Sequence, residues 1–306
     1  MLSFLRYYIK SMRLYYCFVT LTAGYVGMTL VVPEKKTLEK AIICAVLFFC
    51  WGVNQIINDF LNRKEDRINA PKRPMVSGKL DPKKALSLSI LILISIAGYA
   101  VFKNPYALVP AAAGILLNII YAVAKGYGPL GNLLFGMTIA CTTWFGYTLA
   151  GGNTWGLFTD HLKIYFAVVA FNMIMTYFTY FKDNKGDKAA GKETIIVKLG
   201  PKNAGRLGFI LCFIPAIILF LFPINSYYAI AASIGSALFF ATGLAFMKNP
   251  KGPNTYFNLK YNFAAICAAQ SALVSLNYPK EGLILCIISV IGVFLVMGQG
   301  YKNAAE

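Results

Sequence analysis

Charged residues are scarce in this chain. They make up 13% of its 306 residues, whereas hydrophobic residues make up 58%. Soluble proteins carry about 25% charged and 45–50% apolar residues, so a compact soluble protein could not hide this much apolar surface. A disordered chain would need the opposite composition. The scarcity of charge therefore predicts a membrane protein.

Residues that bind soft metals are also few. The single histidine, His161, has no second histidine nearby, and the seven cysteines lie inside apolar runs without the spacing of a metal site. These patterns argue against a zinc centre or a catalytic histidine. They indicate buried structural thiols instead.

Long apolar runs fill most of the sequence. A transmembrane helix needs about 20 mostly apolar residues. Ten segments approach that length: 14–32, 40–60, 85–102, 105–124, 130–150, 163–181, 207–222, 227–247, 261–277 and 282–299. The runs are continuous and too long for the strands of a membrane β-barrel. We expect an all-α, polytopic membrane helical bundle.

The first sixteen residues form an amphipathic segment without the small-residue cleavage site of a signal peptide. We predict a membrane-surface helix that leads into the first span. Arg13, near the start of that span, is a candidate contact for an acidic acceptor or for a lipid headgroup.

The basic residues divide unequally between the two sides that ten spans would create. One side, which includes both termini, holds 23 lysines and arginines, and the other side holds 6. The positive-inside rule places the richer side in the cytoplasm. We therefore expect a multi-pass protein of the cell membrane, whose net charge of +17 reflects topology and anionic groups and not nucleic acid.

Acidic residues are concentrated in two stretches on this cytoplasmic side, 54–80 and 180–200. These stretches contain six of the twelve acids: Asp59, Glu65, Asp66, Asp183, Asp187 and Glu193. Ionisable groups at the level of the membrane are costly and are functional candidates. The alternative is that the two loops are solvated and only set the topology.

The spacing of the polar residues favours a metal-bound substrate. Two sets recur at helical intervals on one face: Asn54, Asn58, Asp59, Asn62 and Asp66 in the first stretch, and Asp183 and Asp187 in the second. Oxygen-only ligation suits Mg²⁺, which takes one or two carboxylates plus substrate phosphates. Basic residues interleave with the acids, which fits a diphosphate better than a cation pore.

In these two stretches the sequence resembles the UbiA superfamily of intramembrane prenyltransferases. The matching residues of the first signature are Asn54, Asn58, Asp59, Asp66, Asn69, Pro71, Arg73, Pro74, Ser77 and Gly78. Those of the second are Asp183, Asp187, Gly191, Thr194, Val197 and Gly200, and a weaker pattern matches Tyr121, Lys125, Gly131 and Asn132. The chain departs from the family at Asn62, where an aspartate is usual.

The resemblance implies one integral-membrane prenyltransferase-like domain over residues 1–306, with nine or ten transmembrane helices around a central cavity. The family has nine helices, so 282–299 would be an extra carboxy-terminal helix. The implied activity is Mg²⁺-dependent transfer of an isoprenyl group from a polyprenyl diphosphate to an aromatic or lipid-phosphate acceptor, with release of diphosphate.

The resemblance also implies roles for individual residues. The metal ligands would be Asn58, Asn62, Asp66, Asp183 and Asp187, supported by Asn54 and Asp59. The diphosphate oxygens would contact Arg63, Arg73, Lys125 and Lys182, and the reacting carbon would be lined by Tyr121, Tyr180 and Asn132. Of these, Asp66, Asp183, Asp187, Lys125 and Tyr121 would be catalytic.

Two other functions remain open from the sequence. A terpene cyclase on the same scaffold would consume the prenyl diphosphate without an acceptor, and the unusual Asn62 leaves room for it. A cation transporter would use the acidic sites for ions and would show no chemistry on prenyl diphosphates.

Overall fold

The protein is described from a computed structural model, which covers residues 2–31, 37–61 and 63–301; the side chains of residues 65, 68, 69 and 298–301 are also outside the description. The elements are α1 (Leu2–Ser11), α2 (Leu14–Met28), α3 (Thr37–Leu61), α4 (Arg63–Asn69), α5 (Pro82–Lys103), the 3-10 turn η1 (Pro105–Ala107), α6 (Leu108–Ala124), α7 (Pro129–Leu149), α8 (Gly156–Asp160), α9 (Leu162–Ala189), α10 (Ile195–Leu211), α11 (Phe213–Phe220), α12 (Ser226–Lys248), α13 (Asn254–Val274) and α14 (Pro279–Tyr301). Over this part of the chain, the predicted all-α fold is confirmed.

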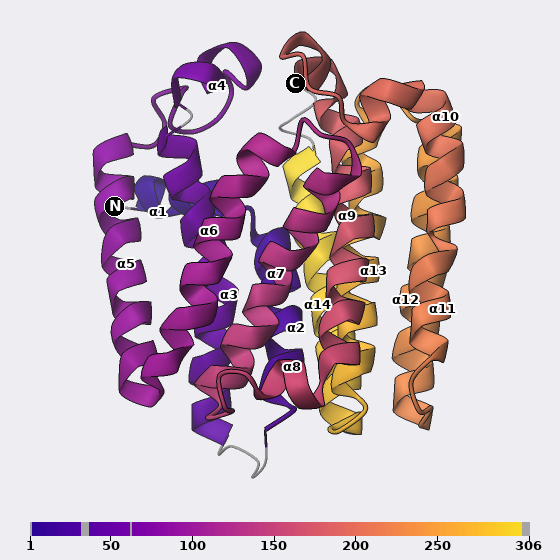
Figure 1. Cartoon of the computed structure of the whole chain (residues 1–306). Helices are drawn as coiled ribbons and strands as arrows, with labels where there is room; N and C mark the ends of the chain where they lie inside the picture. Colours follow the sequence, from indigo (N-terminus) through magenta and orange to yellow (C-terminus); the bar gives the residue numbers. More distant parts are fainter. Residues whose placement is uncertain (1, 32–36, 62, 302–306) are drawn as a thin grey trace.

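The long helices run side by side as a bundle (Figure 1). Each of the ten apolar segments lies in a helix or a helix pair, and seven of these in the described chain are long and apolar enough to cross a membrane. They are α3, α5, η1–α6, α9, α10–α11, α12 and α14. The helix α2 is short, and α7 and α13 are less apolar. Whether nine or ten helices cross the membrane therefore remains a prediction.

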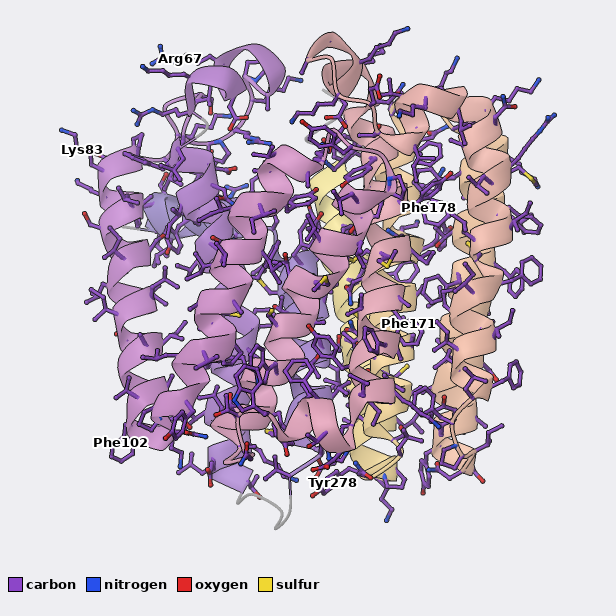
Figure 2. All side chains as sticks on the ribbon, viewed as in Figure 1. Arg67, Lys83, Phe102, Phe171, Phe178 and Tyr278 are labelled. Atoms are coloured by element: carbon purple, nitrogen blue, oxygen red, sulfur yellow. The ribbon has the colours of Figure 1, made fainter. Side chains whose placement is uncertain are left out.

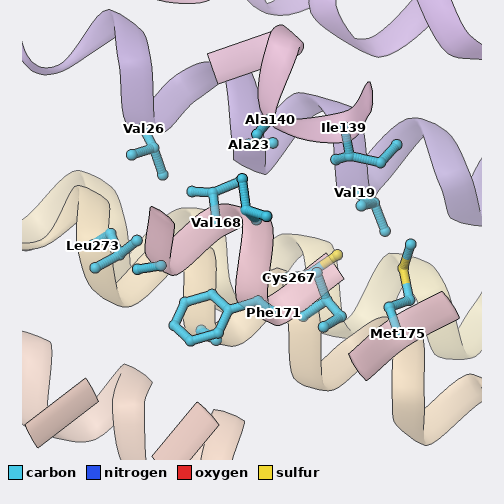
Figure 3. Close-up of a cluster of buried hydrophobic side chains, with 14 of the residues drawn as sticks. Val19, Ala23, Val26, Ile139, Ala140, Val168, Phe171, Met175, Cys267 and Leu273 are labelled. Atoms are coloured by element: carbon cyan, nitrogen blue, oxygen red, sulfur yellow. The ribbon is translucent and has the colours of Figure 1, made fainter. Parts of the chain in front are cut away.

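Four helices form the buried centre of the bundle. Side chains of α2, α7, α9 and α13 pack into one buried cluster (Figure 3). Those labelled there are Val19, Ala23, Val26, Ile139, Ala140, Val168, Phe171, Met175, Cys267 and Leu273. A central helix contacts other helices and not lipid, so it tolerates polar residues that have protein partners. Outer helices expose large apolar side chains, such as Phe102 on α5 and Phe220 on α11, as lipid contact requires.

Glycines allow α2 and α7 to approach each other closely. A Cβ atom on Gly27 would collide with the carbonyl oxygen of Thr143, and one on Gly146 would collide with the carbonyl oxygen of Gly24. Both obstacles are backbone atoms, which cannot rotate away. Small residues at such crossings let helices in lipid gain van der Waals contact.

The two ends of the bundle differ in charge. Arg67 and Lys83 lie at the end that carries α4, and Phe102 and Tyr278 lie at the opposite end (Figure 2). The connection between α9 and α10 lies at the same end as α4 (Figure 1). The two acidic stretches therefore meet at one end of the molecule.

The first prediction concerns the α2–α7 crossing. Gly146→Ala should lower the free energy of unfolding by about 1–3 kcal/mol, because the added methyl group forces two backbones apart. The matched control is Gly98→Ala on α5, where an added Cβ meets nothing within 4 Å; alanine there should be neutral or slightly stabilising. Thermal unfolding in detergent measures both. Equal midpoints for the two variants would contradict the close crossing.

Candidate active site

The first polar cluster joins the start of α2 to the end of α3. Arg13 donates one hydrogen bond to Gln55 (2.6 Å) and another to Asp59 (2.7 Å). Arg73 lies 3.2 Å from the same Asp59 oxygen and also pairs with Asp66 on α4. Asp59 and Asp66 are 4% and 6% exposed. One network of two arginines and two carboxylates therefore holds these segments together.

Arg13 occupies a strained position in this cluster. It is the residue before α2, and it is the one non-glycine residue with positive φ (53°) in the described chain. A left-handed conformation costs an ordinary residue roughly 1–2 kcal/mol. Burial would lower the pKa of Arg13, but the interactions with Asp59 and the nearby tyrosines together outweigh it, and the pKa lies above its ordinary value. The turn thus directs a permanent cation toward α3.

The second polar cluster lies on the last turns of α9. Lys125, from the α6–α7 connection, lies 3.0 Å from carboxylate oxygens of both Asp183 and Asp187. Lys182 lies 2.6 Å from the other oxygen of Asp183. The side chain of Asp187 is 7% exposed. The two clusters together pair four carboxylates with four cations.

Tyrosines of α2 connect the two clusters. Tyr16 lies within electrostatic range of Arg13, Lys182 and Asp183. Its neighbour Tyr15 interacts with Arg13, Arg73 and Lys182. Groups must be near each other to interact in this way, because electrostatic effects weaken with distance. The acidic ends of α3–α4 and of α9 therefore both lie near the start of α2.

Aromatic rings continue from these tyrosines across the bundle. The ring centroids of Tyr16 and Trp51 are 5.9 Å apart, those of Trp51 and Phe135 are 5.8 Å apart, and those of Phe135 and Tyr121 are 5.2 Å apart. We call these four residues the aromatic wall. Lys125 lies 5.0 Å from the ring centroid of Tyr180. A wall of electron-rich faces next to a cationic cluster can stabilise a developing positive charge.

Backbone contacts fix the position of Lys125. The amide of Glu193 donates to the carbonyl of Gly126 (3.0 Å), which ties the α6–α7 connection to the segment after α9. A Cβ on Gly131 would lie 2.8 Å from the Lys125 Cα and 3.0 Å from the Tyr180 hydroxyl. Glycine at 131 therefore lets α7 begin directly against both residues.

The structure brings together most of the residues singled out from the sequence. Asp59, Asp66 and Arg73 form one network, and Lys125, Lys182, Asp183, Asp187 and Tyr180 form the other; Tyr121 interacts with Tyr180. Asn54 and Asn58 lie half-buried on α3. Arg63 lies over the Phe60 ring, 5.0 Å from its centroid. Asn62 is outside the described residues.

Three further residues lie next to these clusters. The sequence interpretation gave no role to Gln55 and Trp51 and left two alternatives for Arg13. Arg13 pairs with Asp59, Gln55 accepts from Arg13, and Trp51 joins the aromatic wall. Arg13 was detectable as a cation at the start of a span. Gln55 and Trp51 carry no signal in one sequence, because amides and indoles are common in helices at a membrane boundary.

The donor set fits Mg²⁺ bound through a substrate. In the described part of the chain, no three carboxylate, histidine or cysteine side chains gather as a closed metal cage. Mg²⁺ does not need one, because it binds one or two carboxylates together with phosphate oxygens and water. The buried Oδ2 of Asp187 has no hydrogen-bond partner among the described residues, which leaves an oxygen ligand available.

Fold and site define a class of protein: a polytopic membrane enzyme that gathers oxygen ligands and cations at one end of its helices. The model of the UbiA prenyltransferase family matches residues 18–266. The chain belongs to this family and is a prenyltransferase, as the sequence resemblance predicted.

Named relatives agree with this assignment. The chain is 30% identical to the digeranylgeranylglyceryl phosphate synthase of Methanobrevibacter smithii over 237 residues, which is 73% of this chain and 82% of the relative. It is 32% identical to the enzyme of that name from Korarchaeum cryptofilum, over 67% of this chain and 70% of the relative.

Solved structures share the fold. A UbiA homologue from Aeropyrum pernix K1 superposes with a TM-score of 0.69 at 17% identity, covering 85% of this chain and 98% of that one. A homologue from Archaeoglobus fulgidus, bound to GPP and Mg²⁺, has a TM-score of 0.60 at 17% identity and covers 95% of this chain and 99% of that one. These likenesses establish the fold.

The second prediction tests the coupling between Lys125 and Asp187. Lys125→Met should lower the free energy of unfolding by about 1–3 kcal/mol in metal-free buffer, because Asp187 would be left buried without a cation. Adding Asp187→Asn to that variant should recover part of the loss, since the amide carries no charge. Thermal unfolding of the wild type, the single variants and the double variant measures the coupling.

The control for this cycle is Lys185→Met, on the exposed face of the same helix. It should change the midpoint little, as surface charges usually do. Strictly additive effects of Lys125→Met and Asp187→Asn would contradict the buried pair.

Proposed function

We propose that the protein transfers an isoprenyl group from a polyprenyl diphosphate to a lipid-phosphate acceptor in a reaction that depends on Mg²⁺. The observation that carries the proposal is that two acid–base clusters, on α3–α4 and on α9, both lie near the start of α2. Such clusters can hold a metal-bound diphosphate between them. The aromatic wall lies where the prenyl carbon would separate from it.

The choice of acceptor is supported by the relatives. Two of them are named for digeranylgeranylglyceryl phosphate, a product with two prenyl chains on a glyceryl phosphate. An acceptor with one chain already attached would carry a phosphate, a free hydroxyl and a long apolar tail. The arginines of the site suit its phosphate, because arginine offers a planar pair of donors to phosphate oxygens. We therefore favour a lipid phosphate over an aromatic acceptor.

Bound Mg²⁺ would supply positive charge to the oxygens of the donor's diphosphate. We assign its protein ligands to Asp66, Asp183 and Asp187, with the amide oxygens of Asn58 and Asn54 nearby. In the structure these carboxylates are paired with lysine and arginine. When substrate binds, those cations would turn to phosphate oxygens and stabilise the charge of the leaving group.

The aromatic residues would act on the other half of the donor. Tyr121 and Tyr180 lie next to Lys125, and the aromatic wall continues into the bundle. Their ring faces can stabilise an allylic carbon as it becomes positive. They also exclude water, which would otherwise capture that carbon. We place this end of the bundle on the cytoplasmic side of the membrane, because it carries most of the lysine and arginine residues.

The third prediction tests this function in lipid nanodiscs. With geranylgeranyl diphosphate, Mg²⁺ and geranylgeranylglyceryl phosphate, the protein should form a doubly prenylated lipid phosphate and release diphosphate, as detected by mass spectrometry. Chelation of Mg²⁺ should abolish the reaction. Asp66→Asn and Asp187→Asn should each reduce turnover by about 100-fold or more, because charge on the leaving group would be poorly stabilised.

The matched control is Asp160→Asn, an exposed acid on α8 at the opposite end of the bundle. It should leave turnover within about twofold of the wild type. Formation of a hydrocarbon or alcohol without acceptor would instead indicate a terpene cyclase. Cation flux across proteoliposomes without any reaction of prenyl diphosphate would indicate a transporter.

A further inference from the structure

Asn132 is a buried amide without hydrogen bonds. It lies in the first turns of α7, after Gly128 and Pro129, and is 4% exposed. Neither its Oδ1 nor its Nδ2 has a hydrogen-bond partner among the described residues. Leaving a buried polar group unpaired costs about 1–3 kcal/mol. Such groups are rare in native proteins and call for an explanation, such as a bound ligand.

The surroundings of Asn132 belong to the reaction site. Phe135 lies three residues further along α7 and therefore on the same face as Asn132. Phe135 contacts the rings of both Trp51 and Tyr121. The preceding residue, Gly131, lies directly against Lys125 and the Tyr180 hydroxyl. Asn132 therefore stands where the aromatic wall meets the α9 cluster.

Other unpaired polar atoms belong to residues of the aromatic wall and the α9 cluster. The indole nitrogen of Trp51, in the aromatic wall, is buried and has no partner among the described residues. The Oδ2 atom of Asp187, which pairs with Lys125 through its other oxygen, is also unpaired. These atoms come from three helices, α3, α7 and α9. Together they offer donors and acceptors to an uncharged polar group as well as to an ion.

We infer that Asn132 binds the hydroxyl group of the acceptor and orients its oxygen toward the prenyl carbon. The inference rests on the proposed function, which supplies an alcohol as the acceptor. The amide oxygen can accept the hydroxyl hydrogen, and the amide nitrogen can donate to a neighbouring oxygen of the acceptor. A neutral amide does this without adding charge next to the metal-binding carboxylates.

The reaction at this position balances without another reagent. A lone pair of the hydroxyl oxygen forms the bond to the prenyl carbon, while the bond from that carbon to the diphosphate breaks and its electrons leave with the diphosphate. The hydroxyl proton passes to the released diphosphate, because the amide of Asn132 cannot take it up. Asn132 thus holds the nucleophile close to the prenyl carbon and in the right orientation, which speeds the reaction between them.

The fourth prediction separates this role from a structural one. Asn132→Leu replaces an unpaired amide by an apolar side chain of similar size, so the thermal midpoint should stay the same or rise. In contrast, kcat/KM for the lipid-phosphate acceptor should fall about 10- to 100-fold, because a substrate hydrogen bond is lost. The KM for geranylgeranyl diphosphate should change by less than about twofold.

The matched control is Asn172→Leu. Asn172 is fully buried on α9; its Oδ1 has no partner among the described residues, but its Nδ2 donates to the Val168 carbonyl at 2.8 Å, a bond that Asn132 lacks. Its replacement should lower the thermal midpoint and leave the kinetics of the acceptor unchanged. The two variants are therefore expected to show opposite patterns.

The possible outcomes are distinct. If Asn132→Leu lowers the midpoint and impairs both substrates alike, the residue is structural and the inference is wrong. Unchanged acceptor kinetics would also overturn the inference and would indicate that an internal water, and not the acceptor, forms hydrogen bonds with the amide. If the wild type itself forms no prenyl ether with the lipid phosphate, the proposed function fails, and this inference fails with it.

Discussion

Charge pairing at one end of the bundle is the constraint on which the rest of the site depends. Four carboxylates at the ends of α3, α4 and α9 are mostly buried, and each has a lysine or arginine within ion-pair distance. Unpaired, each would pay a desolvation penalty of several kcal/mol. Three of the four cations therefore tie a separate segment to a carboxylate: Arg13 the start of α2, Arg73 the segment after α4, and Lys125 the α6–α7 connection.

This arrangement explains how a metal-dependent site can be stable before substrate arrives. Repulsion between the carboxylates is offset by the cations paired with them, which can later bind phosphate. When metal ions and diphosphate bind together, the carboxylates can change partner from cations to metal ions, and the cations can change partner from carboxylates to phosphate. The net charge of the site then changes little. The strained turn at Arg13 and the close start of α7 at Gly131 both serve to keep cations within reach of the carboxylates.

Much of the fold could be predicted from the sequence because lipid imposes long apolar runs. Each of the ten expected segments contains a helix, and several boundaries differ: α2 ends at Met28, and α9 continues to Ala189, so Asp183 and Asp187 lie on the same helix as the span itself. The apolar runs alone did not show which helices are covered by protein, because the central helix α9 is, like the lipid-facing ones, long and apolar enough to cross a membrane. That distinction depends on which neighbours cover a helix.

The candidate site was predictable to the level of residue types at helical spacing. The pairing of Arg73 with both Asp59 and Asp66, and of Lys125 with both acids of α9, was not, because long-range contacts leave no mark in one sequence. Arg63 was grouped with the diphosphate ligands by its position, yet it lies over Phe60. The unpaired amide of Asn132 is visible only once every possible partner has a position in space.

The central claim is that both acidic helix ends hold one diphosphate through divalent ions, and Mn²⁺ binding tests it most directly. Electron paramagnetic resonance can follow Mn²⁺ bound to the protein, and its coupling to phosphorus reports direct contact with phosphate. We predict tight binding only when a non-reactive prenyl diphosphate analogue is present, with phosphorus coupling, and loss of both signals in Asp66→Asn and in Asp187→Asn. Tight Mn²⁺ binding without the analogue, or a signal that survives either substitution, would contradict the account.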